Sequence, residues 1–158
     1  MHESNLTNIA VLGAGSWGIT LAIHCQKIGH HVKLWEFDPK AAETLNKKRQ
    51  RDEVLKDVKI PRDIQVSSDL ENVVQDAHLI ISVVPSHVVR SVFKKLNTVK
   101  TLDSTAVIVN CSKGIENDSL CRISEIADQE LSHLTASRYA VLSGPSHAEE
   151  VSRDIPTA

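Results

Sequence analysis

The chain has few aromatic residues and no long apolar run, and each shortage excludes a class of protein. Aromatic residues make up 3% of the 158 residues, so the core must be built from aliphatic side chains. No apolar run approaches the roughly 20 residues that a membrane-spanning helix requires. Residues 1–8 also lack the apolar core of a signal peptide. We therefore expect no membrane span.

Cysteine is also scarce, and the charge is nearly balanced. Cys25, Cys111 and Cys121 are an odd, scattered set that fits neither a disulfide framework nor the spacing of a metal site. Cys25 and Cys111 stand in apolar runs, where a cysteine is usually a small buried hydrophobe. The net charge of -2 gives no sign of a nucleic-acid or membrane surface as a partner. These features predict a cytoplasmic protein without a bound metal or a nucleic-acid partner.

What the sequence has instead is a regular alternation of two patterns. Its length predicts one domain over residues 1–158, and its hydrophobic content of 41% is enough for a core. Apolar runs predict buried strands at Ile9–Leu12, Val32–Trp35, Leu79–Val84, Ala106–Val109 and Tyr139–Leu142, and a shorter strand at Ile64–Val66. Helical patterns lie between them. Such alternation is typical of an α/β domain, in which helices cover both faces of a parallel sheet.

Local signals mark where these helices begin and which side they bury. N-caps are expected at Asp38 before Pro39, at Ser68 and Ser146 with a glutamate three residues later, and at Ser86. Apolar stripes at helical spacing are Leu21, Cys25 and Ile28, then Val88, Val92 and Leu96, and then Leu120, Ile123, Ala127 and Leu131. The charged stretch Lys47–Arg62 is expected to be an ordinary solvated connection, and a phosphate-attracting basic patch is the alternative.

The most informative motif follows the first strand. Gly13-Ala14-Gly15-Ser16-Trp17-Gly18 has the spacing G-x-G-x-x-G, at a point where a strand passes through a turn into a helix. Gly13 permits the tight turn, Gly15 lets the backbone approach a pyrophosphate, and Gly18 lets the helix pack closely. The N–H groups at the helix start would face the phosphates. The motif predicts a Rossmann dinucleotide-binding fold, a doubly wound and mostly parallel sheet with strand order 3-2-1-4-5-6.

In such a sheet, ligands bind outside the carboxyl ends of the strands, so the polar residues there are candidates. After the second strand, Glu36 or Asp38 is placed to accept from the ribose hydroxyls, although Asp38 also suits an N-cap. A carboxylate there repels a 2′-phosphate, which favours NAD as the cofactor. NADP stays possible, because Lys33 and Lys40 are nearby.

Three further strand ends carry candidates. Pro85, before Ser86 and His87, is either a wall of the cofactor site or a plain proline turn, and His87 is expected to be an exposed helix residue rather than a catalytic base. Lys113 either holds a substrate phosphate or carbonyl oxygen or is a surface lysine, and the residues leave both open. After the last strand, the helix start at Ser146 is expected to point into the same crevice.

Taken in order, these motifs resemble those of the NAD(P)-dependent glycerol-3-phosphate dehydrogenase family, in its cofactor-binding domain. The stretches that match are the glycine turn, Val84-Pro85-Ser86, Ser112-Lys113-Gly114, Ser143-Gly144-Pro145-Ser146 with Glu149, and Pro156-Thr157-Ala158. His147 stands where the family more often has Phe. The resemblance spans nearly the whole chain, and the Lys-Gly and Ser-Gly-Pro-Ser elements are more specific than the glycine turn.

The resemblance implies a set of site residues. The residues expected to bind the cofactor, from the motifs above or from the resemblance, are Gly13, Gly15, Ser16, Trp17, Gly18, Glu36, Phe37, Pro85, Lys113, Ala148 and Glu149. Those implied to contact the substrate are Lys113, Gly144 and Ser146, with Lys113 as the catalytic residue. The reaction implied is hydride transfer between NAD(P)H and dihydroxyacetone phosphate to give sn-glycerol 3-phosphate, which feeds glycerophospholipid synthesis.

The resemblance also implies a part that this sequence does not contain. In the family, a helical domain follows and supplies a proton donor and a clamp for the substrate phosphate. The 158-residue chain is therefore expected to bind cofactor without turning over substrate, and the full-length protein is expected to be a homodimer. The alternatives are a stand-alone NAD-binding or sensing module and a Rossmann domain that binds FAD or a methyl donor.

Overall fold

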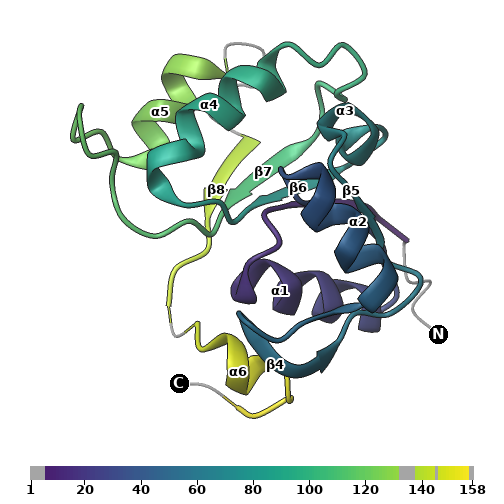
Figure 1. Ribbon diagram of the computed structural model, residues 1–158. Coiled ribbons are helices and arrows are strands. Elements are labelled where there is room, and N and C mark those ends of the chain that lie inside the picture. Colours follow the sequence, from purple (N-terminus) through teal and green to yellow (C-terminus); the bar gives the residue numbers. More distant parts are fainter. Residues whose placement is uncertain (1–5, 132–137, 145, 157–158) are drawn as a thin grey trace, which may run out of the picture.

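The computed structural model describes residues 6–131, 138–144 and 146–156 of the chain. Its centre is a six-stranded sheet with helices on both faces, which is a three-layer α/β arrangement (Figure 1). Every pair of neighbouring strands in this sheet is parallel. The predicted fold class, a doubly wound parallel sheet, is therefore confirmed. Pro145, Thr157 and Ala158, which belong to the matching motifs, lie outside the described residues.

The six strands lie in the order that the glycine motif predicts. They are β1 (Asn8–Leu12), β2 (His31–Trp35), β5 (Gln65–Ser67), β6 (Leu79–Ser82), β7 (Val107–Asn110) and β8 (Tyr139–Val141). Across the sheet the order is β5-β2-β1-β6-β7-β8, which is 3-2-1-4-5-6 when these strands are numbered along the chain. The order reverses between β1 and β6, and a crevice for ligands is expected at the carboxyl ends on either side of that point.

Strand β1 is the centre of the sheet. Ile9, Ala10, Val11 and Leu12 are all buried, and they pair in register with β2 on one side and β6 on the other. A strand covered on both faces needs apolar side chains at successive positions, not alternate ones. The continuous apolar run in the sequence is the direct result of this double burial.

Helices cover both faces because each parallel connection must cross over the sheet. One face carries α1 (Ser16–Lys27), α2 (Pro39–Lys48) and α6 (Ala148–Val151). The other face carries α3 (Leu70–Val74), α4 (Ser86–Asn97) and α5 (Ile123–Glu130). Figure 1 shows α4 beside α5 on one side of the sheet and α1 beside α2 on the other. Each layer buries its own aliphatic cluster against the strands, as the low aromatic content predicts.

The prediction of an ordinary solvated connection over Lys47–Arg62 is wrong in one respect. The segment contains an antiparallel hairpin of β3 (Gln50–Arg51) and β4 (Leu55–Lys59). Leu55 and Ile60 are buried in the cluster that also contains the apolar residues of α1 and α2. These two buried side chains, with the partly buried Val54 and Val58, fix the hairpin to the core, and a charge pattern alone does not reveal them.

Two helix starts are decided by aspartates. Asp38 caps α2 as predicted, and its carboxylate accepts from the Ala41 N–H over 2.8 Å. The predicted cap of α3 at Ser68 is wrong, because Asp69 takes that place and accepts from the Asn72 N–H over 3.2 Å. A carboxylate is the stronger acceptor for a helix N-terminus, and here it stands one residue nearer to the helix.

The predicted caps at Ser86 and Ser146 are also wrong. Pro85 holds an extended conformation and takes the N-cap position of α4, so Ser86 is the first helical residue. His147 takes the corresponding position of α6, and the helix begins at Ala148. Neither helix has a side-chain hydrogen bond at its cap.

The last of the predicted stripes is correct for α5 and wrong before it. Ile123, Ala127 and Leu131 are buried against α4 and the sheet. Leu120 is 68% exposed and adopts a positive φ of 58°, so it belongs to the loop that precedes the helix. Periodicity assigned it to the helix because Leu120 stands three residues before Ile123, at helical spacing in the sequence.

Candidate functional site

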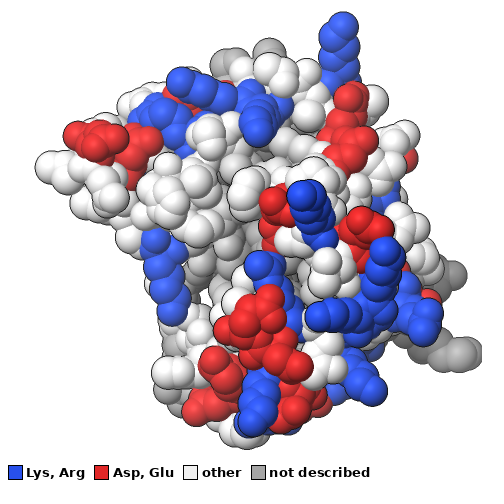
Figure 2. Space-filling view, viewed as in Figure 1, with Lys and Arg blue, Asp and Glu red and all other residues white. Residues whose placement is uncertain are grey.

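A crevice runs along the carboxyl ends of the strands, where the topology predicts it. It encloses about 990 Å³ and opens between the layer of α1 and the layer of α4. Its lining comes from the glycine turn, the end of β2, the start of α4, the loop after β7 and the segment before α6. Figure 2 shows a hollow on this face, with acidic and basic side chains mixed around it. A volume of this size suits a dinucleotide rather than a single small metabolite.

The glycine turn begins this crevice. Gly13 has a φ of 116°, and a Cβ there would stand 2.8 Å from the Val83 carbonyl oxygen. A Cβ on Gly18 would stand 1.8 Å from the Gly13 carbonyl oxygen, so any side chain would break the turn itself. Both positions therefore require glycine for the fold. The predicted reason for Gly18, close helix packing, is confirmed, with the turn as its nearest neighbour.

Gly15 is glycine for a different reason. A Cβ on Gly15 would have no heavy atom within 4 Å, and its φ of −76° is open to any residue. Gly15 lines the crevice and is the N-cap of α1, where it has no side chain to satisfy the first N–H groups. These N–H groups and the positive end of a 12-residue helix are left for an anion from outside the chain. The turn therefore fits a pyrophosphate.

The end of β2 carries an ion pair that the sequence does not predict. Glu36 is buried, and its Oε2 accepts from Arg51 Nη1 over 2.5 Å. The same nitrogen of Arg51 donates to the Ala14 carbonyl over 3.0 Å, which ties the hairpin to the glycine turn. Glu36 Oε1 accepts from the Asp38 N–H over 3.2 Å. Glu36 is thus the carboxylate that lines the crevice at the end of β2, whereas the carboxylate of Asp38 caps α2 and Asp38 does not line the crevice.

Phe37 follows Glu36 and behaves unlike the other apolar residues of the crevice. Its side chain is 73% exposed, although it lines the cavity beside Glu36. An aromatic ring left in water gains nothing for the fold, but it offers a flat apolar face to a base. This exposure fits the adenosine contact that the family resemblance implies for Phe37.

Lys113 lies in the loop after β7 and lines the crevice with an exposed side chain. Asn110 is buried, and its carboxamide accepts from the Ser112 N–H over 3.2 Å and donates to the Ser112 carbonyl over 3.3 Å. Gly114 has a φ of 91°, and a Cβ there would stand 3.4 Å from the Ser86 Oγ. The backbone before Lys113 is therefore held in place, and the positive φ of Gly114 favours glycine directly after it. The sequence left open whether Lys113 lies in the ligand crevice or is an ordinary surface lysine, and the structure fits the first hypothesis.

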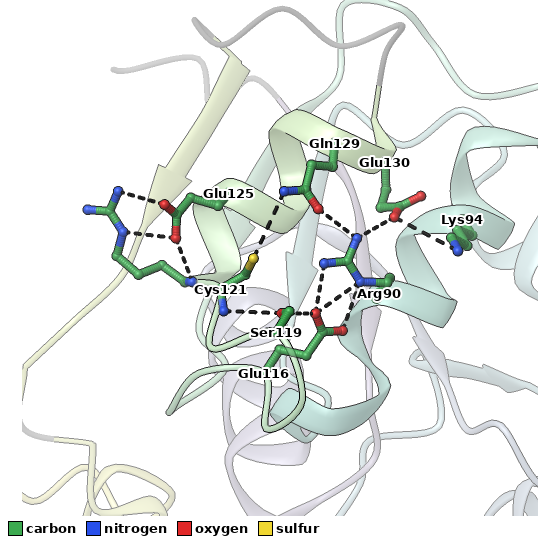
Figure 3. A network of polar contacts seen from close by, with 9 residues as sticks. Arg90, Lys94, Glu116, Ser119, Cys121, Glu125, Gln129 and Glu130 are labelled. Atoms are coloured by element: carbon green, nitrogen blue, oxygen red, sulfur yellow. Dashed lines mark hydrogen bonds and ion pairs between the residues drawn. The ribbon is translucent and has the colours of Figure 1, made fainter.

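A network of charges clamps the same loop from behind (Figure 3). Arg90 on α4 donates to both carboxylate oxygens of Glu116, over 2.7 to 3.0 Å, and also binds Glu130 on α5. Ser119 donates to Glu116 as well. The Arg90 guanidinium holds the pKa of the Glu116 carboxyl at about 2, well below its ordinary value of 4.5. Glu116 lies three residues after Lys113, so this pair joins the crevice loop to the helical layer.

The segment before α6 and the first residues of α6 line the crevice from the face of the sheet that carries α1. Ser146, His147, Ala148 and Glu149 all line it. The hydroxyl of Thr20 on α1 donates to the Ala148 carbonyl over 3.2 Å in a buried contact, which fixes this segment to the helix of the glycine turn. The sequence prediction that this helix start faces the crevice agrees with the lining.

Most of the predicted site residues meet in this one crevice. The lining contains Gly13, Gly15, Ser16, Trp17, Glu36, Phe37, Pro85, Lys113, Ser146, Ala148 and Glu149. Gly18 lies behind it as a packing residue, and Gly144 lies outside the lining, so its substrate contact stays a prediction. Arg51, which the sequence analysis considered only within the alternative basic patch, and Lys95, which it did not single out, also line the crevice. Arg51 was hidden in a mixed charge run, and no local pattern pairs it with Glu36.

Other chemistry finds no support in the described residues. Cys111 lines the crevice, but burial raises the pKa of its thiol to about 11, so it is a packed thiol rather than a nucleophile. In the described part of the chain, no cluster of three or more His, Cys, Asp or Glu side chains is arranged to hold a metal ion. Over the same residues, every helix is too short or too polar to cross a bilayer.

Strand order, glycine turn and crevice together define a dinucleotide-binding domain of the Rossmann class. The family model described as "NAD-dependent glycerol-3-phosphate dehydrogenase N-terminus" matches residues 8–158. The chain therefore belongs to the family of NAD-dependent glycerol-3-phosphate dehydrogenases and corresponds to their N-terminal part.

Named relatives agree with this assignment. The chain is 44% identical over 150 residues to a glycerol-3-phosphate dehydrogenase [NAD(P)+] of Thermoanaerobacter, covering 95% of this chain and 43% of the relative. It is 41% identical to the enzyme of that name from Fusobacterium nucleatum, covering 96% and 44%. The crystal structure of the Coxiella burnetii glycerol-3-phosphate dehydrogenase matches with a TM-score of 0.85 and 29% identity, over 96% of this chain and 45% of that one. The chain thus spans less than half the length of these relatives.

Proposed function

We propose that the crevice binds a nicotinamide adenine dinucleotide, with its pyrophosphate on the glycine turn. The observation that carries this is Gly15, whose missing Cβ would stand in open space at the N-terminus of α1. Glycine there serves no contact of the fold, so its use is the close approach of an anion to the backbone N–H groups. The adenosine then lies toward Glu36 and Phe37, and the nicotinamide toward Pro85, Ala148 and Glu149.

The proposed substrate pair is dihydroxyacetone phosphate and sn-glycerol 3-phosphate, beside Lys113, Gly144 and Ser146. The relatives at 44% and 41% identity are named for this activity. When bound, the nicotinamide supplies the hydride that reduces the carbonyl carbon. The Lys113 ammonium provides donors for the substrate phosphate or for the oxygen that gains negative charge, and the hydrogen-bonded backbone before it limits where those donors point.

We further propose that residues 1–158 are the cofactor-binding domain of a longer enzyme that is a cytoplasmic homodimer and feeds glycerophospholipid synthesis. The reaction requires a proton donor at the carbonyl oxygen and a clamp on the phosphate, held together beside the hydride carrier. A single lysine does not readily serve both purposes several ångströms apart. The proposed helical domain supplies the proton donor and the phosphate clamp. The relatives, which are more than twice as long as this chain, are consistent with such a domain.

The test is a thermal melt of the 158-residue chain with and without millimolar NADH. At a ligand concentration of about 100 times Kd, binding to the native state alone adds about 2.7 kcal/mol to the stability. A folded sample whose melting temperature does not move would contradict the cofactor proposal.

The activity has its own test. The chain alone should show no steady oxidation of NADH with dihydroxyacetone phosphate, whereas a longer protein containing this sequence should show it. Lys113→Ala in that longer protein should cut turnover strongly and leave the melting temperature nearly unchanged, because the side chain is exposed. Turnover by the chain alone would refute the domain proposal, and full turnover in the variant would remove Lys113 from the site.

A further inference from the structure

The part of the crevice lined by Glu36, Phe37 and Arg51, where the adenosine is proposed to lie, is called the adenosine corner below. It contains a hydrogen-bond acceptor, Glu36, and a donor, Arg51, held together as an ion pair. Arg51 on β3 donates through Nη1 to Glu36 Oε2 and to the Ala14 carbonyl, and through Nε to Glu53 over 3.2 Å. Among the described residues, Nη2 of Arg51 has no hydrogen-bond partner, and the side chain is 26% exposed. Both Arg51 and Glu36 line the crevice. Arg51 therefore keeps free donors in a residue that lines the crevice while it holds the carboxylate.

NAD and NADP differ at the 2′ position of the adenosine ribose, where a carboxylate suits the first and a guanidinium suits the second. NAD carries a 2′-hydroxyl on the adenosine ribose, which needs an acceptor such as a carboxylate. NADP carries a 2′-phosphate, which a carboxylate repels and a guanidinium binds in a two-pronged geometry. A corner with Glu36 alone would favour NAD strongly, and one with Arg51 alone would favour NADP.

Other cations near the corner are less well placed. Lys33 donates from Nζ to the Asn72 carbonyl over 2.7 Å, and neither Lys33 nor Lys40 lines the crevice. Lys95 lines it from α4, the layer on the other face of the sheet from the hairpin. Arg51 is the cation in contact with both the ribose carboxylate and the glycine turn.

We propose that Glu36 and Arg51 form an exchangeable pair, in which each side chain can turn from its partner to the cofactor. This pair determines the ratio of the affinities for NAD(H) and NADP(H). With NAD(H), Glu36 accepts from the 2′-hydroxyl while Arg51 stays on the carboxylate and cancels its charge. With NADP(H), Arg51 turns its free donors, and in part its bond to Glu36, to the 2′-phosphate. The paired state rejects neither cofactor, so this corner accepts both. The proposal rests on the proposed function, because it assumes that the crevice binds a nicotinamide dinucleotide.

The test is the ratio of the dissociation constants for NADPH and NADH, measured by fluorescence titration of the chain. Arg51→Gln removes charge-assisted hydrogen bonds to the phosphate and frees the carboxylate, so the ratio should rise at least about tenfold. Glu36→Gln keeps the shape of the side chain and removes the repulsion, so the ratio should fall. Lys40→Gln is the matched control, because it removes one positive charge outside the crevice and should leave the ratio within about twofold.

The outcomes separate this proposal from the proposed function. If the unaltered chain binds neither cofactor, both fail. If it binds them and folded Arg51→Gln keeps the original ratio, the exchangeable pair is refuted while the cofactor site stands. A rise of the ratio in Lys95→Gln without one in Arg51→Gln would refute it too and move the phosphate contact to α4. Should Arg51→Gln fail to fold by circular dichroism, Glu36→Gln decides, and an unchanged ratio there refutes the pair.

Discussion

The glycine turn and the adenosine corner touch each other, yet the protein builds them in opposite ways. The turn acts through its backbone, and its three glycines lie within Gly13–Gly18, although the Val83 carbonyl also crowds Gly13 from outside. The corner acts through two side chains, Glu36 and Arg51, that come from different elements and meet only in the fold. The Lys113 loop resembles the corner, since its own Glu116 is held by Arg90 from α4, a distant part of the chain. Local sequence determines the first kind of site, and long-range packing determines the second.

Within the turn, the fold and the ligand make separate demands on two glycines, and the largest expected effect tests the fold. Gly18→Ala puts a Cβ where the Gly13 carbonyl oxygen already stands, at 1.8 Å, so the turn must open. We expect a loss of more than about 2 kcal/mol in the free energy of unfolding, by analogy with severe overpacking. Urea denaturation of the purified variant measures it. An unfolding midpoint equal to that of the unaltered chain would mean that the turn opens to admit a Cβ at little cost in free energy.

Gly15→Val is the matched change for the ligand. The Cβ meets no atom of the chain and φ is ordinary, so the loss of stability should stay near the roughly 1 kcal/mol of a poor N-cap. The branched side chain fills the space of the pyrophosphate, and the thermal shift with NADH should vanish. If this variant still binds NADH, the phosphates lie elsewhere in the crevice, and the two glycines no longer differ in purpose.

The sequence predicts the parts of this molecule that depend on local pattern. The strand order, the glycine turn and the Asp38 cap are confirmed, because each follows from apolar runs or from residues a few positions apart. The crevice position of Lys113 follows from topology alone, since the carboxyl ends of parallel strands share one edge.

What the sequence does not predict are the contacts between distant segments. The hairpin of β3 and β4 was hidden because Leu55 is the buried residue of a largely charged strand, and Arg51 looked like one more charge in a mixed run. Its partner Glu36 is identified only when the hairpin folds back onto the turn. The Arg90 network is hidden for the same reason, because charge pairing across 26 or 40 residues leaves no periodic signal.

The exposed ring at the adenosine corner gives a smaller effect that isolates binding from folding. Phe37→Ala removes a side chain that is 73% exposed, so stability should change by no more than about 0.5 kcal/mol. Loss of stacking on the adenine base should weaken NADH binding about tenfold, near the lower end of the roughly 1–3 kcal/mol range for base–aromatic stacking. Fluorescence titration and a thermal melt on one sample separate the two. Unchanged affinity would leave Phe37 as a surface residue without a role in the corner.

The smallest expected effect concerns the charges behind the Lys113 loop, which should make that loop sensitive to acid while the glycine turn is not. Because Arg90 lowers the pKa of the Glu116 carboxyl from 4.5 to about 2 in the fold, the pair's contribution is complete above about pH 4.5 and is lost as the pH falls toward 2. Glu116→Gln should therefore lower the melting temperature at pH 7 and flatten its fall between pH 5 and about 3.

Glu125→Gln is the matched control. Arg122 also lowers the pKa of the Glu125 carboxyl, but both side chains of that pair are exposed, so the melting curve of this variant should stay nearer to that of the unaltered chain. Parallel melting curves for the unaltered chain and Glu116→Gln would show that the loop is held without the carboxylate, by Asn110 and the backbone alone, and the loop would then belong with the glycine turn rather than with the corner.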